Sequence, residues 1–108
     1  MDDVKLHDVL QGLTMLAIEK SLLDFSPIAY NKVLEHLEEN HNSYISDCYS
    51  KPQILRETLT ELYIRSYHDI VSRITEELYE FRYQKSIERF LVILNPNFVE
   101  NIDASHYN

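Results

Sequence analysis

The sequence predicts an all-α fold, a small bundle of four to five helices. One observation is composition: the 108 residues include one glycine and three prolines, whereas average usage would give roughly thirteen such residues in a chain of this length. The other is that apolar residues, 44% of the chain, recur at helical spacing. Hairpin turns, phosphate-binding loops and nucleophile elbows need glycine, so the composition excludes sites of these kinds.

The first predicted helix covers residues 4–23, where apolar positions follow the i, i+3, i+4, i+7 pattern. Its inner face is expected to comprise six residues: Leu6, Val9, Leu10, Leu13, Leu16 and Ala17. Four more apolar residues widen that face, so we expect burial on more than one side: Met15, Ile18, Leu22 and Leu23. Gly12 lies inside this helix at a cost of about 1 kcal/mol relative to alanine. Close packing against another helix is the expected reason.

A second helix is predicted to begin after Ser26, which can cap it, with Pro27 at the first helical position. It should end near Asn40. Because no glycine is available there, we expect the left-handed residue that ends it to be Asn40, His41 or Asn42.

Residues 50–53 match the Ser-x-x-Gln capping box and predict the start of a third helix at Ser50. At about 100° per residue, the apolar stripe then changes direction around residues 64–66. This change predicts a break with a new helix capped by Ser66.

A second change of direction follows Phe81, but residues 82–85 contain neither glycine nor proline. The chain could turn there without them. We expect instead that one helix continues to Leu94, giving a long C-terminal helix that projects or mediates dimerisation. Asn95 and Pro96 end it, because the residue before proline disfavours helical geometry. Residues 1–94 then form a single helical domain and residues 95–108 a polar tail.

The candidate interaction site is a stripe on the outer side of that helix. Its five residues are Tyr79, Tyr83, Ile87, Phe90 and Leu94. Monomers rarely leave an apolar stripe of this size uncovered. Either the stripe folds back on the N-terminal helix as core, or it binds a second copy or another protein's helix.

The formal charge of −8 repels nucleic acids and anionic membranes and suits a basic partner. A single cysteine permits no internal disulfide. The start of the chain lacks a signal-peptide pattern, and no apolar run reaches 18 residues. We therefore expect a cytoplasmic protein without a membrane partner.

No catalytic, cofactor-binding or metal site is expected. Glu38 and His41 form the one Glu-x-x-His motif of the sequence, whereas a di-iron bundle needs two such motifs and a zinc site needs three or four grouped ligands. Cys48 could act as a nucleophile, but Asp47 beside it would raise its pKa. A helix-turn-helix would use basic residues that alternate here with acidic ones: Arg65, His68, Arg73 and Arg82.

The function predicted from sequence is that of a non-catalytic protein-interaction module, regulatory or adaptor in kind. It would self-associate through the C-terminal helix as a homodimer, or bind another helical protein, a basic one included. Two alternatives stay open. One is a nucleic-acid-binding transcriptional regulator with a helix-turn-helix-like unit, and the other is a thiol- or metal-dependent enzyme that uses Cys48.

Overall fold

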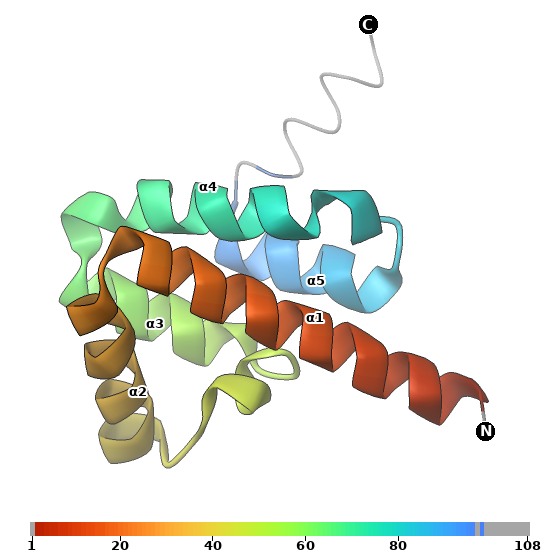
Figure 1. Cartoon of the computed structure of the whole chain (residues 1–108), viewed down its shortest axis with the longest axis horizontal. Coiled ribbons are helices and arrows are strands. Elements are labelled where there is room, and N and C mark those ends of the chain that lie inside the picture. The colour runs from red at the N-terminus through yellow and green to blue at the C-terminus, as the bar shows by residue number, and fades with distance from the viewer. Residues whose placement is uncertain (1, 97, 99–108) are drawn as a thin grey trace, which may run out of the picture.

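The computed structural model describes residues 2–96 and 98 (Figure 1). This part of the chain contains no strand, so the predicted all-α class is confirmed. The five α-helices are α1 (Asp2–Phe25), α2 (Pro27–His41), α3 (Pro52–Leu62), α4 (Tyr67–Leu78) and α5 (Lys85–Leu94). Three short 3₁₀ helices connect them: η1 (Ile45–Cys48), η2 (Ile64–Ser66) and η3 (Tyr79–Phe81). Among the described helices, none has the length and apolarity to cross a bilayer.

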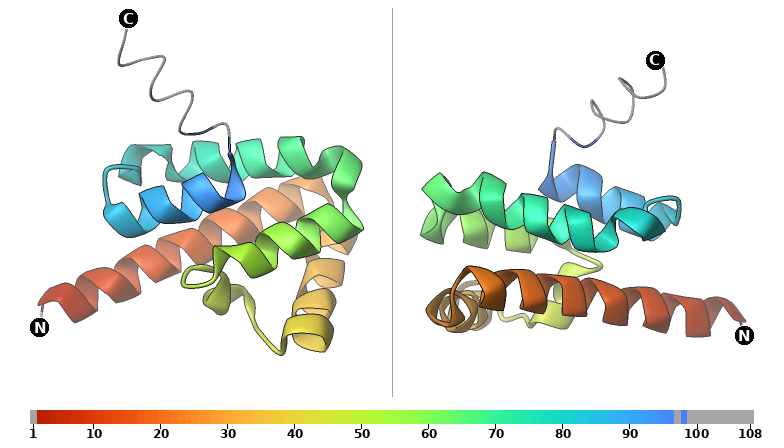
Figure 2. Two further views of the ribbon diagram at one scale, coloured as in Figure 1. Left: turned by 180° about the vertical axis from the view of Figure 1, so that it is seen from behind. Right: turned by 45° about the horizontal axis from the view of Figure 1, so that its top comes forward.

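The helices form two layers (Figure 2). One layer contains α1 and α2, and the other contains α3, α4 and α5. The shortest dimension is 21 Å, which corresponds to two helices of about 10 Å diameter stacked on each other. Between the layers lies a core in which Ile18 and Leu22 from α1 and Phe90 from α5 are fully buried.

The predicted boundaries of α2 are confirmed. The Ser26 side chain accepts a hydrogen bond from the backbone N–H of Ala29 at 3.4 Å, and Pro27 is the first helical residue. At the other end, Asn42 has the left-handed conformation (φ 49°), and its N–H donates to the carbonyl of Glu38. Asparagine tolerates this conformation better than most residues, so it replaces the missing glycine.

The predicted capping box at Ser50 is wrong. The N-cap of α3 is Lys51, without a side-chain cap, and Pro52 is the first helical residue. The N–H of Lys51 donates to the carbonyl of Asp47 at 2.9 Å. The turn that follows η1 therefore continues through Ser50, and the helix begins beyond it.

The break predicted at residues 64–66 is confirmed, since η2 occupies them and α4 starts at Tyr67. Ser66 is at the N-cap position, but its side chain makes no capping hydrogen bond.

The predicted long C-terminal helix is wrong, because α4 ends at Leu78 and α5 has only 10 residues. Arg82 donates from its backbone N–H and from its guanidinium Nη1 to the carbonyl of Tyr79, at 3.2 and 2.8 Å. Gln84 is extended, and its N–H donates to the carbonyl of Phe81. The chain thus reverses without glycine or proline. The reversal lets α5 pack its apolar side against the chain's own core.

The predicted inner face of α1 is only partly right. Leu10 and Ala17 are buried, together with residues that lie on the same side: Thr14, Ile18, Ser21 and Leu22. Four of the residues expected to be buried are 41–63% exposed: Leu6, Val9, Leu16 and Leu23. At about 100° per residue, the two sets point in directions roughly 140° apart. The helix therefore has two apolar faces, of which the rest of the chain covers one.

Gly12 gives a first testable prediction, because the expected close packing around it is wrong. A Cβ atom added at Gly12 would meet nothing within 4 Å. We expect Gly12→Ala to raise the free energy of unfolding by about 1 kcal/mol, the difference in helix propensity. Urea denaturation measures this change. A loss of stability would mean that another element packs against this position.

Most of the predicted polar tail, at 97 and 99–108, lies outside the described residues. Asn95 and Phe98 are described and are buried, 8% and 2% exposed. Phe98 is part of the core cluster.

Candidate functional site

The apolar face of α1 that points away from the core is the strongest candidate for a functional surface. Its residues follow one another at alternating intervals of three and four: Leu6, Val9, Leu13, Leu16, Lys20 and Leu23. We call these six residues the outward face of α1. Alternating intervals of three and four are the spacing of the contact positions in a coiled coil. Leu16 is 63% exposed and Val9 is 56% exposed, whereas Leu13 is half-buried.

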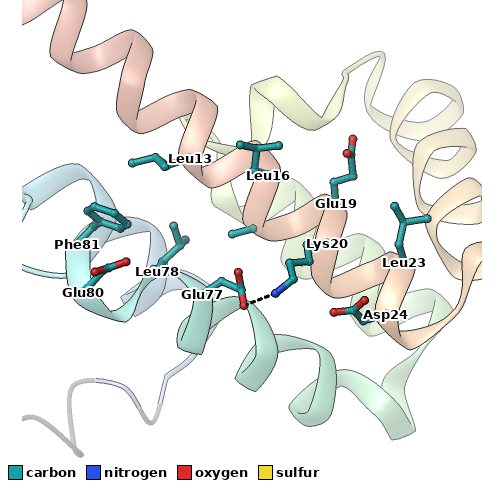
Figure 3. A pocket seen from close by; sticks show the side chains of 11 residues that line it. Leu13, Leu16, Glu19, Lys20, Leu23, Asp24, Glu77, Leu78, Glu80 and Phe81 are labelled. Carbon is teal, nitrogen blue, oxygen red and sulfur yellow. Dashed lines mark hydrogen bonds and ion pairs between the residues drawn. The ribbon is translucent and has the colours of Figure 1, made fainter.

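A hollow of about 570 Å³ lies between the second half of the outward face and the end of α4 (Figure 3). Its apolar lining comes from both sides: Leu13, Leu16, Ala17 and Leu23 from α1, with Leu78 and Phe81 opposite. Leu78 and Ala17 are buried and form its floor. The hollow is open to solvent, so it suits side chains that project from another protein.

Carboxylates border this hollow. Glu19 and Asp24 extend from α1, and Glu77 and Glu80 extend from the opposite side (Figure 3). We call these four residues the acidic rim. All four are exposed. At neutral pH, the rim gives this apolar surface a strongly negative border.

Lys20 is the one cation among the described residues that line the hollow. Its Nζ lies 3.0 Å from a carboxylate oxygen of Glu77. The hydrogen bond with Glu77 and the charge of that carboxylate raise the pKa of Lys20. Lys20 therefore stays charged and neutralises one carboxylate, while Glu19 accepts only a neutral phenol hydrogen bond from Tyr30 at 3.0 Å.

The five residues predicted as an interaction stripe do not form one surface. Ile87, Phe90 and Leu94 are fully buried in the core of the chain. Tyr79 and Tyr83 are 48% and 75% exposed at the turn between α4 and α5. Tyr83 also lines a shallower hollow of about 360 Å³ together with Leu6, at the first turns of the outward face.

Sequence reasoning assigned the outward face to the core, although one signal marks it. Lys20 occupies a position in the row of Leu13, Leu16 and Leu23, and a lysine is rarely tolerated in a core. A second row passes through Leu10, Thr14, Ala17 and Ser21 and carries no charge over these residues. The uncharged row was the better candidate for the buried side.

Cys48 gives a second prediction. The residue is fully buried, and burial, together with the charge of Asp47, raises the pKa of its thiol to about 12 from 9.0. Since only the thiolate reacts, we expect iodoacetamide at pH 8 to alkylate the native protein at least about a hundredfold more slowly than the urea-unfolded protein. Equal rates in the two states would contradict the burial of this thiol.

Two histidines lie beside a second hollow of about 630 Å³ between α2 and α3. The ring centroids of His36 and His41 are 5.9 Å apart. His36 Nε2 lies 3.2 Å from Glu61, and His41 Nε2 lies 3.8 Å from Glu57. Within residues 2–96 and 98, no group of three or more side chains could hold a metal ion. These contacts connect α2 with α3.

Two arginines of the predicted helix-turn-helix unit, Arg73 and Arg82, have partners within the chain. Arg73 pairs with Asp69 at 3.6 Å. The Arg82 guanidinium stacks on the ring of Tyr79, 3.9 Å from its centroid. Reaching a base or a phosphate would cost both arginines these contacts.

The exposed apolar residues of the outward face and the carboxylates of the acidic rim are thus the features from which we infer a function. The chain matches no protein-family model, no curated protein and no solved structure.

Proposed function

We propose that this protein is a non-catalytic, cytoplasmic protein-interaction module, regulatory or adaptor in kind, which binds a helix of another protein along the outward face of α1. The observation that carries the proposal is a row of exposed leucines at coiled-coil spacing on a helix whose opposite side already completes the core. The partner helix would cover the row and place its own apolar side chains in the hollow beside Leu16 and Leu23.

The energy of burial supports this proposal. Fully burying a leucine side chain contributes about 1.5–3 kcal/mol relative to leaving it in water. Contiguous exposed apolar residues with a polar border are characteristic of interaction surfaces. Leu16 and Val9 contribute little to the core, because more than half of each side chain is exposed and neither packs against the core cluster.

A binding role also agrees with the state of the reactive side chains. The Cys48 thiol is buried and protonated. His36 is engaged on both sides of its ring, since Nδ1 lies 3.2 Å from the hydroxyl of Thr58 and Nε2 contacts Glu61. Neither group is placed to react with a bound substrate.

A photo-cross-linking experiment tests the proposal. A photoreactive residue replaces Leu16 on the outward face, and the same residue replaces Glu38, exposed on α2, as the matched control. In extracts of the cells that express the protein, we expect a discrete protein to be cross-linked from position 16 but not from position 38. The cross-linked protein is then purified, and its affinity for the unmodified chain is measured.

The purified partner should bind Leu16→Ser at least about tenfold more weakly than the wild type, because roughly 1.4 kcal/mol or more of burial is lost. Equal affinities for the wild type and Leu16→Ser would contradict the proposal. Cross-linking of the same protein from both positions would contradict it as well.

A further inference from the structure

The charges around the outward face indicate what kind of helix would occupy it. We infer that the partner is a cationic amphipathic helix, with an apolar row that covers the outward face and with lysines or arginines that contact the acidic rim. This inference rests on the proposed function and adds the chemistry of the partner to it.

The acidic rim lies where the flanking charges of a partner helix would lie. Glu19 directly precedes the contact position of Lys20, and Asp24 directly follows that of Leu23. In a coiled coil, the residues beside the contact row carry the charges that select the partner. Glu77 and Glu80 extend the same charge along the opposite side of the hollow (Figure 3).

The pairing of Lys20 leaves the rest of the rim available. The Lys20 ammonium already has a carboxylate partner 3.0 Å away in Glu77. The ion pairs of the described residues include none with Glu19, Asp24 or Glu80. Cationic side chains of a partner would therefore meet Glu19 and Glu80, which form no ion pair among the described residues, and Asp24, whose charge acts on Lys20 without pairing with it. The overall charge of −8 adds to the attraction.

A second copy of the chain fits this surface less well. In a parallel pair, the acidic rim of one copy would approach the rim of the other. In an antiparallel pair, the rim would approach the first turns of the other copy, where the described side chains include one cation, Lys5, and one carboxylate, Asp8. The parallel pair brings like charges together at the border of the contact, and the antiparallel pair offers the rim no net positive charge, so both fit less well than a cationic helix.

The dimensions of the outward face set the length of the partner. From Leu6 to Leu23 the face extends over about 26 Å at 1.5 Å per residue. A helix of roughly 18–21 residues would cover it. Because the acidic rim surrounds only the half that contains Lys20 and Leu23, the basic residues of the partner should concentrate toward one of its ends.

Two designed peptides of about 20 residues test the inference. They share one leucine row at coiled-coil spacing, and their flanking positions carry lysine in one peptide and glutamate in the other. Fluorescence anisotropy measures their binding to the full chain at low and at high salt. We expect the lysine peptide to bind at least about tenfold more tightly than the glutamate peptide at low salt, with a smaller difference at high salt.

Charge-neutral variants determine which carboxylates are responsible for the preference for the lysine peptide. The rim variant Glu19→Gln/Asp24→Asn/Glu80→Gln should bind the lysine peptide at least about tenfold more weakly than the wild type does. The matched control variant Glu35→Gln/Glu38→Gln/Glu39→Gln removes the same number of charges from the exposed side of α2 and should retain nearly all affinity. An equal loss in both variants would overturn the inference, since the peptide would then respond only to net charge.

A third variant, Leu16→Ser/Leu23→Ser, separates this inference from the proposed function. If this variant binds both peptides more weakly than the wild type does, and the wild type binds the two peptides equally well, the interaction surface stands and the cationic partner is overturned. If the variant binds both peptides as tightly as the wild type does, the interaction surface itself is overturned. If light scattering finds a wild-type dimer that this variant dissociates, the outward face belongs to a second copy, which also overturns the cationic partner. Circular dichroism establishes that each variant is folded.

Discussion

Replacing Phe90 with alanine is expected to lower the free energy of unfolding by about 3–5 kcal/mol. Phe90 has the largest side chain among the fully buried described residues, and it belongs to α5 and to the core cluster. A small domain has a total stability of about 5–15 kcal/mol, so this loss would bring the protein close to unfolding. Urea denaturation followed by circular dichroism measures the change.

Tyr83 provides the matched control, because its side chain is 75% exposed. We expect Tyr83→Ala to change the free energy of unfolding by no more than about 0.5 kcal/mol. Sequence analysis placed both residues on one interaction stripe. If Phe90→Ala proved as mild as Tyr83→Ala, α5 would not be part of the core.

Leu22→Ala has the second largest expected effect, a loss of about 2–5 kcal/mol in the free energy of unfolding. Leu22 is fully buried, so alanine would leave a cavity between the layers. The control is Leu16→Ala on the same helix, where the leucine is 63% exposed. We expect that variant to stay within about 0.5 kcal/mol of the wild type.

This pair of variants tests whether α1 has one structural face and one free face. Thermal or urea unfolding of both variants under identical conditions provides the comparison. Equal destabilisation would show that the chain itself covers the outward face, and would leave no exposed leucine row for a partner.

Local signals in the sequence predicted the helix boundaries that depend on local chemistry. Ser26 caps α2 and Asn42 ends it; both roles follow from which side chains tolerate or stabilise helix ends. The break before Tyr67 could be predicted because the apolar stripe changes direction there.

The turn after α4 could not be predicted in the same way. It depends on Arg82 and Gln84 donating hydrogen bonds to carbonyls of η3, and neither residue type is a turn signal. The two apolar stripes on either side of the turn were recognised correctly as pointing in different directions. Once the chain reverses between them, both stripes can contribute to the same core.

The exposed apolar face of α1 was not predicted from the sequence. The acidic composition favoured a basic partner, which stays a prediction, and we propose the rim around Lys20 as the place where such a partner binds. The position was missed because periodicity alone cannot decide which of two apolar faces the rest of the chain covers. That choice depends on the packing of α4 and α5 against α1, which no local pattern encodes.

The most direct test of the central proposal is a titration of the full chain with the lysine peptide, followed in amide NMR spectra. We expect the largest shift changes along the outward face, at Leu13, Leu16, Lys20 and Leu23, and across the hollow near Phe81. Changes concentrated on α2 or α5, with the outward face of α1 unaffected, would contradict the proposal.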